Sequence, residues 1–195
     1  MDDKRPPVPD VVTTLAAQQD MREAYLGGAP GLFVSGAVWA VAGLVCLWRS
    51  PQTAVWALYA GGVLIHPLSV LLTRLLGRSG RHASGNPLGM LAFATTIWMI
   101  LMLFLAYGIA LWRIELFFPA MLFIIGGRYL TFATLFGGKV FWVCGAVLAA
   151  AGYGLATQHA APAAGAFAGS VIEIVFGGIV LAAMRGTRGT ARVSA

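Results

Sequence analysis

Long apolar runs follow one another along most of the chain, and each is broken by a short polar or glycine-rich stretch. Six of these runs are close to the length that crosses the hydrocarbon core of a bilayer, which takes about 20 helical residues. They cover residues 30–48, 53–76, 87–112, 114–136, 138–157 and 165–184. The pattern predicts an all-α fold, a polytopic membrane bundle of six transmembrane helices.

The polar stretches between the runs indicate the connections. The stretch "WRSPQT" ends the first run with a short turn, and "GRSGRHASGNP" is a longer basic loop before the third run. Asn86 followed by Pro87 indicates a helix start, because asparagine caps helices and proline is favoured in the first turn. The stretch "WRIE" at 112–115 allows either a tight hairpin or one long bent helix, and we interpret it as a hairpin.

Residues 1–29 precede the first run, and they contain no apolar core of a cleaved secretory signal. Asp10 can cap a short helix within residues 11–26, whose apolar face is imperfect. This segment is either an interfacial helix under the bundle or a solvated tail. The predicted organisation is an N-terminal tail (1–29), a six-span domain (30–184) and a basic C-terminal tail (185–195).

Basic residues are distributed unevenly between the two sides that alternate spans define. If the N-terminus is inside, the outer segments contain only Arg49 and Arg113. The inner segments contain Lys4, Arg5, Arg22, Arg74, Arg78, Arg81, Lys139, Arg185, Arg188 and Arg192. Because lysine and arginine are retained on the cytoplasmic side, we predict that both termini are cytoplasmic.

Composition agrees with the pattern, since 59% hydrophobic residues, 10% charged residues and a mean hydropathy of +0.82 exclude an ordinary soluble domain. The net charge of +6 is explained by topology and by attraction to membrane lipids, without a nucleic-acid partner. Cys46 and Cys144 lie in apolar runs and are interpreted as free thiols. Motifs of hydrolases, NTPases and zinc sites are missing from the sequence, so no metal site and no cofactor is predicted.

The second run carries small and polar residues at helical spacing on one face. They are Tyr59, Gly62, His66, Ser69 and Thr73. A lipid-facing surface gives no reason for such a stripe, so we expect it to face other helices or a cavity. Pro67 bends the helix beside His66. The alternative is a kinked packing helix in which His66 hydrogen-bonds to a neighbouring helix.

Two further runs contain an ionisable residue near mid-depth, Arg128 and Glu173. An unpaired charge at that depth costs about 2.5–3.5 kcal/mol on insertion scales, so the two are predicted to form an ion pair. The pair either fixes the register of two helices or belongs to a ligand or proton site.

Two segments have similar small residues, "VSGAVWAVAG" at 34–43 and "VCGAVLAAAG" at 143–152. Their small faces consist of Gly36, Ala40 and Gly43, and of Gly145, Ala149 and Gly152. Such faces let helices approach closely. We predict that they also join subunits in a homo-oligomer, a dimer or trimer; the alternative is that both pack inside one chain.

The start "NPL" at 86–88 and the stretch "FFPAMLFIIGGRYLTF" at 117–132 resemble a domain-of-unknown-function family of small polytopic bacterial membrane proteins. In that family's pattern, histidine is usual where Arg128 stands and proline where Thr131 stands. The resemblance implies a multi-pass protein of a bacterial inner membrane, and it implies no activity.

We therefore predict a polar seam inside the bundle that binds a ligand. Its residues are His66, Ser69, Thr73, Arg128, Tyr129, Thr131 and Glu173. The first hypothesis is binding or translocation of a small anionic or amphiphilic ligand, with Arg128 as charge partner and His66 as hydrogen-bond or proton partner. The second is an intramembrane lipid-modifying enzyme with His66 as general base. The third is a non-catalytic scaffold or assembly subunit.

Overall fold

The computed structural model describes residues 13–193, and over this range the chain is helical without strands. The helices are α1 (Thr14–Tyr25), α2 (Ala29–Trp48), α3 (Pro51–Leu75), α4 (Leu88–Trp112), α5 (Phe117–Phe136), α6 (Val140–Thr157) and α7 (Pro162–Val193). Two short 3-10 turns, η1 (Leu26–Gly28) and η2 (Ile114–Leu116), precede α2 and α5. Six helical segments are long and apolar enough to cross a membrane, which confirms the predicted six-span all-α fold.

Helix boundaries follow the capping signals in the sequence. Ser50 caps α3 by accepting a 3.2 Å hydrogen bond from the backbone N–H of Thr53, and Asn86 Oδ1 accepts one of 2.9 Å from the N–H of Leu88 at the start of α4. Arg113 is extended, with φ −146° and ψ 101°, so α4 ends there. The hairpin interpretation of "WRIE" is confirmed, and the single bent helix is excluded.

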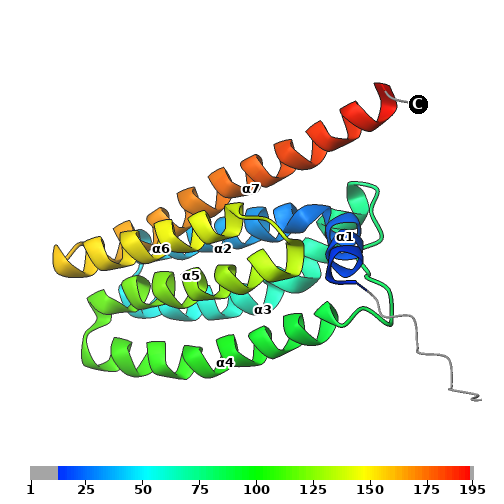
Figure 1. Ribbon diagram of the computed structural model, residues 1–195. Coiled ribbons are helices and arrows are strands. Elements are labelled where there is room, and N and C mark those ends of the chain that lie inside the picture. Colours follow the sequence, from blue (N-terminus) through cyan, green and yellow to red (C-terminus); the bar gives the residue numbers. More distant parts are fainter. Residues whose placement is uncertain (1–12, 194–195) are drawn as a thin grey trace, which may run out of the picture.

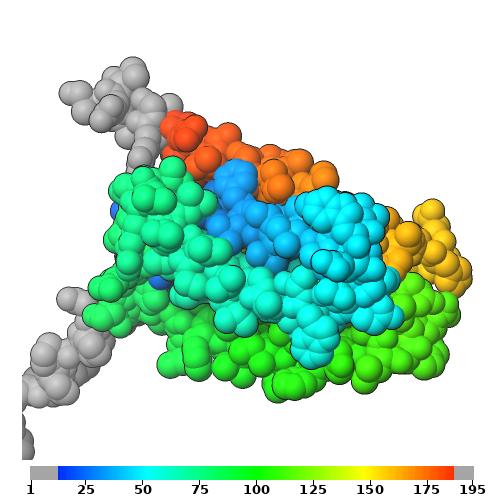
Figure 2. Space-filling view, turned by 180° about the vertical axis from the view of Figure 1, so that it is seen from behind, coloured from blue at the N-terminus to red at the C-terminus, as the bar shows by residue number. Residues whose placement is uncertain are grey.

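The six long helices form two rows of three. One row places α2 between α3 and α7, and the other places α5 between α4 and α6. Figure 1 shows the long helices side by side, and Figure 2 shows α2 in blue between α3 in cyan and α7 in orange. Contacts of α7 with α5 and α6 join the rows, so side chains of α2, α5, α6 and α7 meet in the interior.

The small-residue faces are used inside the chain. A Cβ placed on Gly36 of α2 would lie 2.7 Å from Ile174 of α7, and one on Gly145 of α6 would lie 2.6 Å from the backbone oxygen of Gly126 in α5. Glycine is needed at both places because the helices touch there. The homo-oligomer was predicted from spare small-residue faces, and these two positions are already occupied by helices of the same chain.

Helix α1 lies across one end of the bundle (Figure 1). Its N-cap is Thr13, whose Oγ1 accepts from the N–H of Ala16 at 3.2 Å, whereas the predicted cap Asp10 lies outside the described residues. Of the alternatives for this segment, the structure shows a packed helix, with Ala17 and Met21 in the core. Its position at a membrane surface stays a prediction.

Side chains of α1 cap the end of α5. Arg22 Nη1 donates to the carbonyl of Phe136 at 2.8 Å, and Gln18 Nε2 donates to the carbonyl of Thr134 at 2.8 Å. A cationic side chain satisfies the free carbonyls at a helix C-terminus and opposes the negative end of its dipole. Gly137 follows in the left-handed region with φ 65°, and a Cβ there would lie 2.4 Å from Gln18.

The start of α1 and the end of α7 lie at the same end of the bundle (Figure 1). The α3–α4 and α5–α6 connections are also at this end, which carries Arg74, Arg81 and Lys139. Arg49 and Arg113 follow α2 and α4 at the opposite end. The distribution agrees with the predicted orientation, which itself stays a prediction; Lys4 and Arg5 lie outside the described residues.

Candidate functional site

The candidate site is a buried carboxyl group between the two rows of helices. Glu173 of α7 is 0% exposed, and its Oε1 accepts a 2.8 Å hydrogen bond from the hydroxyl of Tyr129 in α5. Ser35 of α2 lies beside the carboxyl group, and Cys144 of α6 interacts with it electrostatically. All three neighbours are buried, so four helices enclose this carboxyl.

Close helix packing brings the carboxyl against short side chains of α2. Gly36, next to Ser35, lies so near α7 that a Cβ there would be 3.1 Å from the carbonyl oxygen of Ser170. Gly169, four residues before Glu173, faces the ring of Trp39, and a Cβ on that glycine would lie 2.6 Å from the ring. The small residues of both helices thus place Ser35 within reach of the carboxyl group.

Aromatic rings surround the partner of this carboxyl. The ring of Tyr129 stacks on that of Phe141 at 6.2 Å with an interplanar angle of 12°, and it meets Phe132 edge-on at 5.3 Å. Phe136 extends the cluster beside Phe132 and Phe141. This packing fixes the tyrosine ring and surrounds the hydrogen bond with apolar groups, where an unpaired polar atom is costly.

The second oxygen of the Glu173 carboxyl group has no hydrogen-bond partner. Glu173 Oε2 is buried without a hydrogen bond of good geometry, although Ser35 lies nearby. Buried polar atoms without a partner are uncommon in folded proteins, and leaving one costs about 1–3 kcal/mol. This oxygen is therefore a polar atom of the interior that is available to bind another group.

Arg128 lies near the middle of α5 and turns toward α4. Its Nη1 lies 2.8 Å from Met99 Sδ, its Nη2 lies 3.4 Å from Thr96 Oγ1, and its guanidinium carbon lies 5.3 Å from the centre of the Phe132 ring. Its Nε is buried without a hydrogen-bond partner. Every one of these neighbours is uncharged, so none of them neutralises the guanidinium.

The predicted ion pair between Arg128 and Glu173 is wrong as a direct contact. Glu173 is hydrogen-bonded to Tyr129, and the contacts of Arg128 are on α4. Successive residues of an α-helix point about 100° apart, which follows from 3.6 residues per turn. Arg128 and Tyr129 therefore contact different neighbouring helices of α5. The charges of Arg128 and Glu173 interact only through space.

The polar stripe of α3 is separate from this carboxyl. Ser69 Oγ donates to the carbonyl of His66 at 2.9 Å, and Thr73 Oγ1 donates to that of Ser69 at 2.7 Å, so both hydroxyls are satisfied within their own helix. His66 is exposed on the bundle surface, and no hydrogen bond in the described part of the chain joins its ring to Arg128 or Glu173.

Thr131, the remaining residue of the predicted seam, also forms its hydrogen bond within its own helix. Its Oγ1 donates to the carbonyl of Arg128 at 2.7 Å. Of the seven residues predicted to line one seam, the structure therefore brings together Tyr129 and Glu173 by a direct contact. Arg128 precedes Tyr129 in the sequence but is turned to α4, and the three residues of α3 lie elsewhere.

Sequence reasoning missed Ser35 and Cys144 as neighbours of the carboxyl group. A signal for them was present, because they occupy corresponding places in the two similar segments, "VSG" at 34–36 and "VCG" at 143–145. In each segment a small polar residue precedes the glycine at which two helices touch. Met99 and Thr96, the neighbours of Arg128, had no such signal in the sequence of α4.

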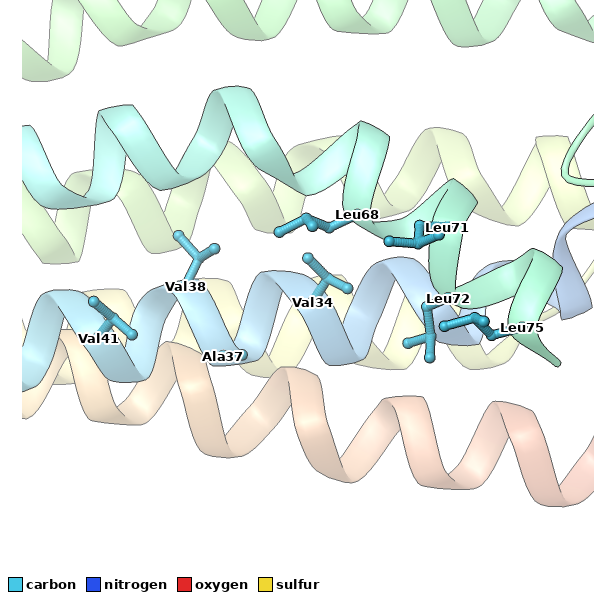
Figure 3. A pocket seen from close by; sticks show the side chains of 8 residues that line it. All are labelled: Val34, Ala37, Val38, Val41, Leu68, Leu71, Leu72 and Leu75. Carbon is cyan, nitrogen blue, oxygen red and sulfur yellow. The ribbon is translucent and has the colours of Figure 1, made fainter.

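A shallow groove of about 420 Å³ lies between α2 and α3. Figure 3 shows its lining, which consists of Val34, Ala37, Val38, Val41, Leu68, Leu71, Leu72 and Leu75. All of these side chains are aliphatic, and no group that could act as an acid, base or nucleophile is among them. The groove suits a hydrocarbon chain and contains no chemistry of its own.

A model of a family of unknown function (DUF7010) matches residues 14–183, so the chain belongs to that family. The match begins with α1 and covers the six spans. It confirms the expected membership in an uncharacterised family of this kind. No curated protein and no solved structure matches the chain.

Proposed function

We propose that this member of the DUF7010 family binds a small amphiphilic ligand with an anionic group inside the bilayer, or carries it across, and that Arg128 is the charge partner of the anion. The observation that supports this is a guanidinium near mid-span for which no carboxylate of the described residues is within ion-pairing distance. A bound anion supplies the missing charge.

The energetic argument rests on the cost of that charge. A guanidinium stays protonated in proteins, and a charged side chain at the centre of a membrane helix costs about 2.5–3.5 kcal/mol on insertion scales. A thioether, a hydroxyl and a phenyl ring reduce this cost but leave the charge in place. A guanidinium that only packs inside a span is therefore energetically unfavourable. An arginine that binds an anionic ligand accounts for a charged residue at this position.

The contacts of the guanidinium leave one edge of it free for an anion. Nε has no hydrogen-bond partner, and the contact of Nη2 with Thr96 is long at 3.4 Å. These two N–H groups form the edge that binds carboxylates and phosphates with two parallel hydrogen bonds. The Met99 side chain, which contacts the remaining nitrogen Nη1, is flexible, so it can adjust when the guanidinium binds a ligand.

The enzyme hypothesis finds less support. It needs His66 as a general base beside an acid partner, whereas His66 is exposed and its hydrogen-bonded neighbour Ser69 contacts only its backbone. We accordingly leave His66 out of the proposed site. We further propose a bacterial inner membrane with both termini in the cytoplasm; the basic residues at one end of the bundle support the orientation.

The test compares two probes that differ in charge but share a chain. Laurate and dodecanol are titrated into the protein in nanodiscs of zwitterionic phosphatidylcholine, and binding is measured by isothermal titration calorimetry. We expect laurate to bind the wild type and R128Q to weaken it about tenfold or more, because a charge-assisted hydrogen bond contributes about 1.5–3 kcal/mol. R49Q, which removes an exposed arginine, is the matched control and should leave binding unchanged.

Two results would overturn the proposal. Equal binding of laurate and dodecanol would show that the anionic group is not recognised. Equal binding of laurate by the wild type and R128Q would show that recognition occurs elsewhere. If the wild type binds neither probe, the scaffold hypothesis becomes the better account of these spans.

A further inference from the structure

We infer that Glu173 is a proton-binding site, and that proton binding there is favoured when an anion occupies Arg128. The first half of this inference stands on the buried carboxyl group alone, and the second half rests on the proposed function. Together they describe a bundle that takes up a proton with its anionic ligand.

The first step is the environment of the carboxyl group. Glu173 is 0% exposed, and no cation of the described residues is within ion-pairing distance of it. An isolated carboxylate in an apolar interior is strongly disfavoured, and such groups take up a proton instead. The neutral acid is the form that this interior accommodates.

The second step is the geometry of the two oxygens. Oε1 accepts a hydrogen bond from the hydroxyl of Tyr129, as the carbonyl oxygen of a neutral carboxylic acid can. Oε2 is the atom without a partner, so the proton binds there and forms the O–H group of the acid. The hydroxyl oxygen of Ser35 lies beside the carboxyl and is the available acceptor for that O–H.

The third step concerns the groups that face the carboxyl from each helix packed around it. They are the hydroxyl of Ser35 on α2, the phenol of Tyr129 on α5 and the thiol of Cys144 on α6, while the guanidinium of Arg128 on α5 is turned to α4. Arg128 is the charged group among these residues, and it acts on Glu173 through space. Burial is the dominant influence on the carboxyl, and the charge of Arg128 adds a smaller one that favours its ionised form.

The coupling follows from the sign of that interaction. The positive charge of Arg128 stabilises the ionised form of Glu173, and an anion bound to Arg128 cancels this effect. Anion binding therefore favours the protonated carboxyl, and by reciprocity protonation favours anion binding. Coupling between two sites is commonly 5–150-fold, so we expect about a tenfold effect, equivalent to a shift of about one pH unit.

The experiment is infrared difference spectroscopy of the protein in nanodiscs as pH is changed, with and without laurate. A band of a protonated carboxylic acid should be present, and it should be lost in E173Q and kept in E23Q, which alters an exposed glutamate of α1. Y129F should move the frequency of the band, because the hydrogen bond to Oε1 is lost. Laurate should raise the pH midpoint of the band by about one unit.

The outcomes separate the two proposals. A carboxylic acid band that is absent in the folded wild type, or that persists in E173Q, overturns the proton site. If E173Q does not fold, an unchanged band frequency in Y129F overturns the site instead. A band that titrates normally but does not respond to laurate, although laurate binds in the calorimeter, overturns the coupling alone. Failure of laurate to bind removes the proposed function and leaves the proton site standing.

Discussion

The hydroxyl of Tyr129 donates a 2.8 Å hydrogen bond to Oε1 of Glu173 in the opposite row of helices, while the preceding residue, Arg128, turns to α4 in its own row and contacts Met99. Two neighbouring residues of α5 thus belong to two different environments. One is a closed interior between four helices, and the other is the contact with α4.

Removal of the Tyr129 hydroxyl should destabilise the protein, because Y129F leaves Glu173 Oε1 buried without its donor. We expect the free energy of unfolding to fall by about 1–3 kcal/mol. Denaturation of the purified protein in mixed micelles, followed by tryptophan fluorescence, measures this. Y153F is the matched control, since Tyr153 is 66% exposed, and it should change stability by less than about 0.5 kcal/mol. Similar losses in the two variants would argue against the buried hydrogen bond.

A methyl group at Gly145 should push α5 and α6 apart. In G145A the new Cβ would lie 2.6 Å from the carbonyl oxygen of Gly126, which is backbone and cannot move alone. Overpacking of this kind costs about 1–3 kcal/mol, measurable by the same denaturation. G62A is the control, because a Cβ at Gly62 meets nothing within 4 Å and alanine favours a helix more than glycine does. A G145A variant as stable as G62A would contradict the close contact.

The loop before α4 should depend on Asn86. Its Nδ2 donates to the carbonyl of Ala17 at 2.9 Å and to Asp20 Oδ2 at 2.7 Å, while its Oδ1 caps α4. N86A loses all three bonds, and the cap alone contributes about 0.5–2 kcal/mol. Hydrogen exchange measured by mass spectrometry should become faster in residues 76–88. R81Q, at an exposed loop position, should leave exchange unchanged. An N86A protein that exchanges like R81Q would show that the hydrogen bonds of Asn86 do not stabilise this loop.

The orientation can be tested with reporter fusions. Because basic residues gather at one end of the bundle, fusions after Arg81 and at the C-terminus should be active as cytoplasmic reporters. A fusion near His159, in the connection between α6 and α7, should be active only as an external reporter. A C-terminal fusion exposed outside the cell would contradict the predicted topology.

The fold could be read from the sequence because its determinants are local. Each span needs only length and hydropathy, and caps such as Ser50 and Asn86 act on the residues that follow them. The start of α1 was predicted less well. Asp10 and Thr13 are both good caps by type, so residue type alone did not distinguish them, and the observed cap is Thr13.

The site was predicted only in part because it depends on which helices are neighbours. Arg128 and Glu173 were recognised as unusual from their depth, and this required no knowledge of packing. Their pairing was inferred from opposite charge and from their depth in the spans, and the rotation of α5 instead presents Tyr129 to Glu173. The stripe of His66, Ser69 and Thr73 does share one helix face, but hydroxyls in a helix can bond to their own backbone, so a shared face did not imply a shared site.

The most direct test of the account is a pair of double-mutant cycles on stability, one for Tyr129 with Glu173 and one for Arg128 with Glu173, made with Y129F, R128Q and E173Q. Because the phenol and the carboxyl are in contact, we predict a coupling energy of about 1–3 kcal/mol for the first pair. Because the guanidinium contacts α4, and the measurement is made at a pH at which Glu173 is protonated, we predict near-additive effects, within about 0.5 kcal/mol, for the second. A larger coupling for Arg128 with Glu173 than for Tyr129 with Glu173 would show that the two charges are partners and that Arg128 is not free for an anion.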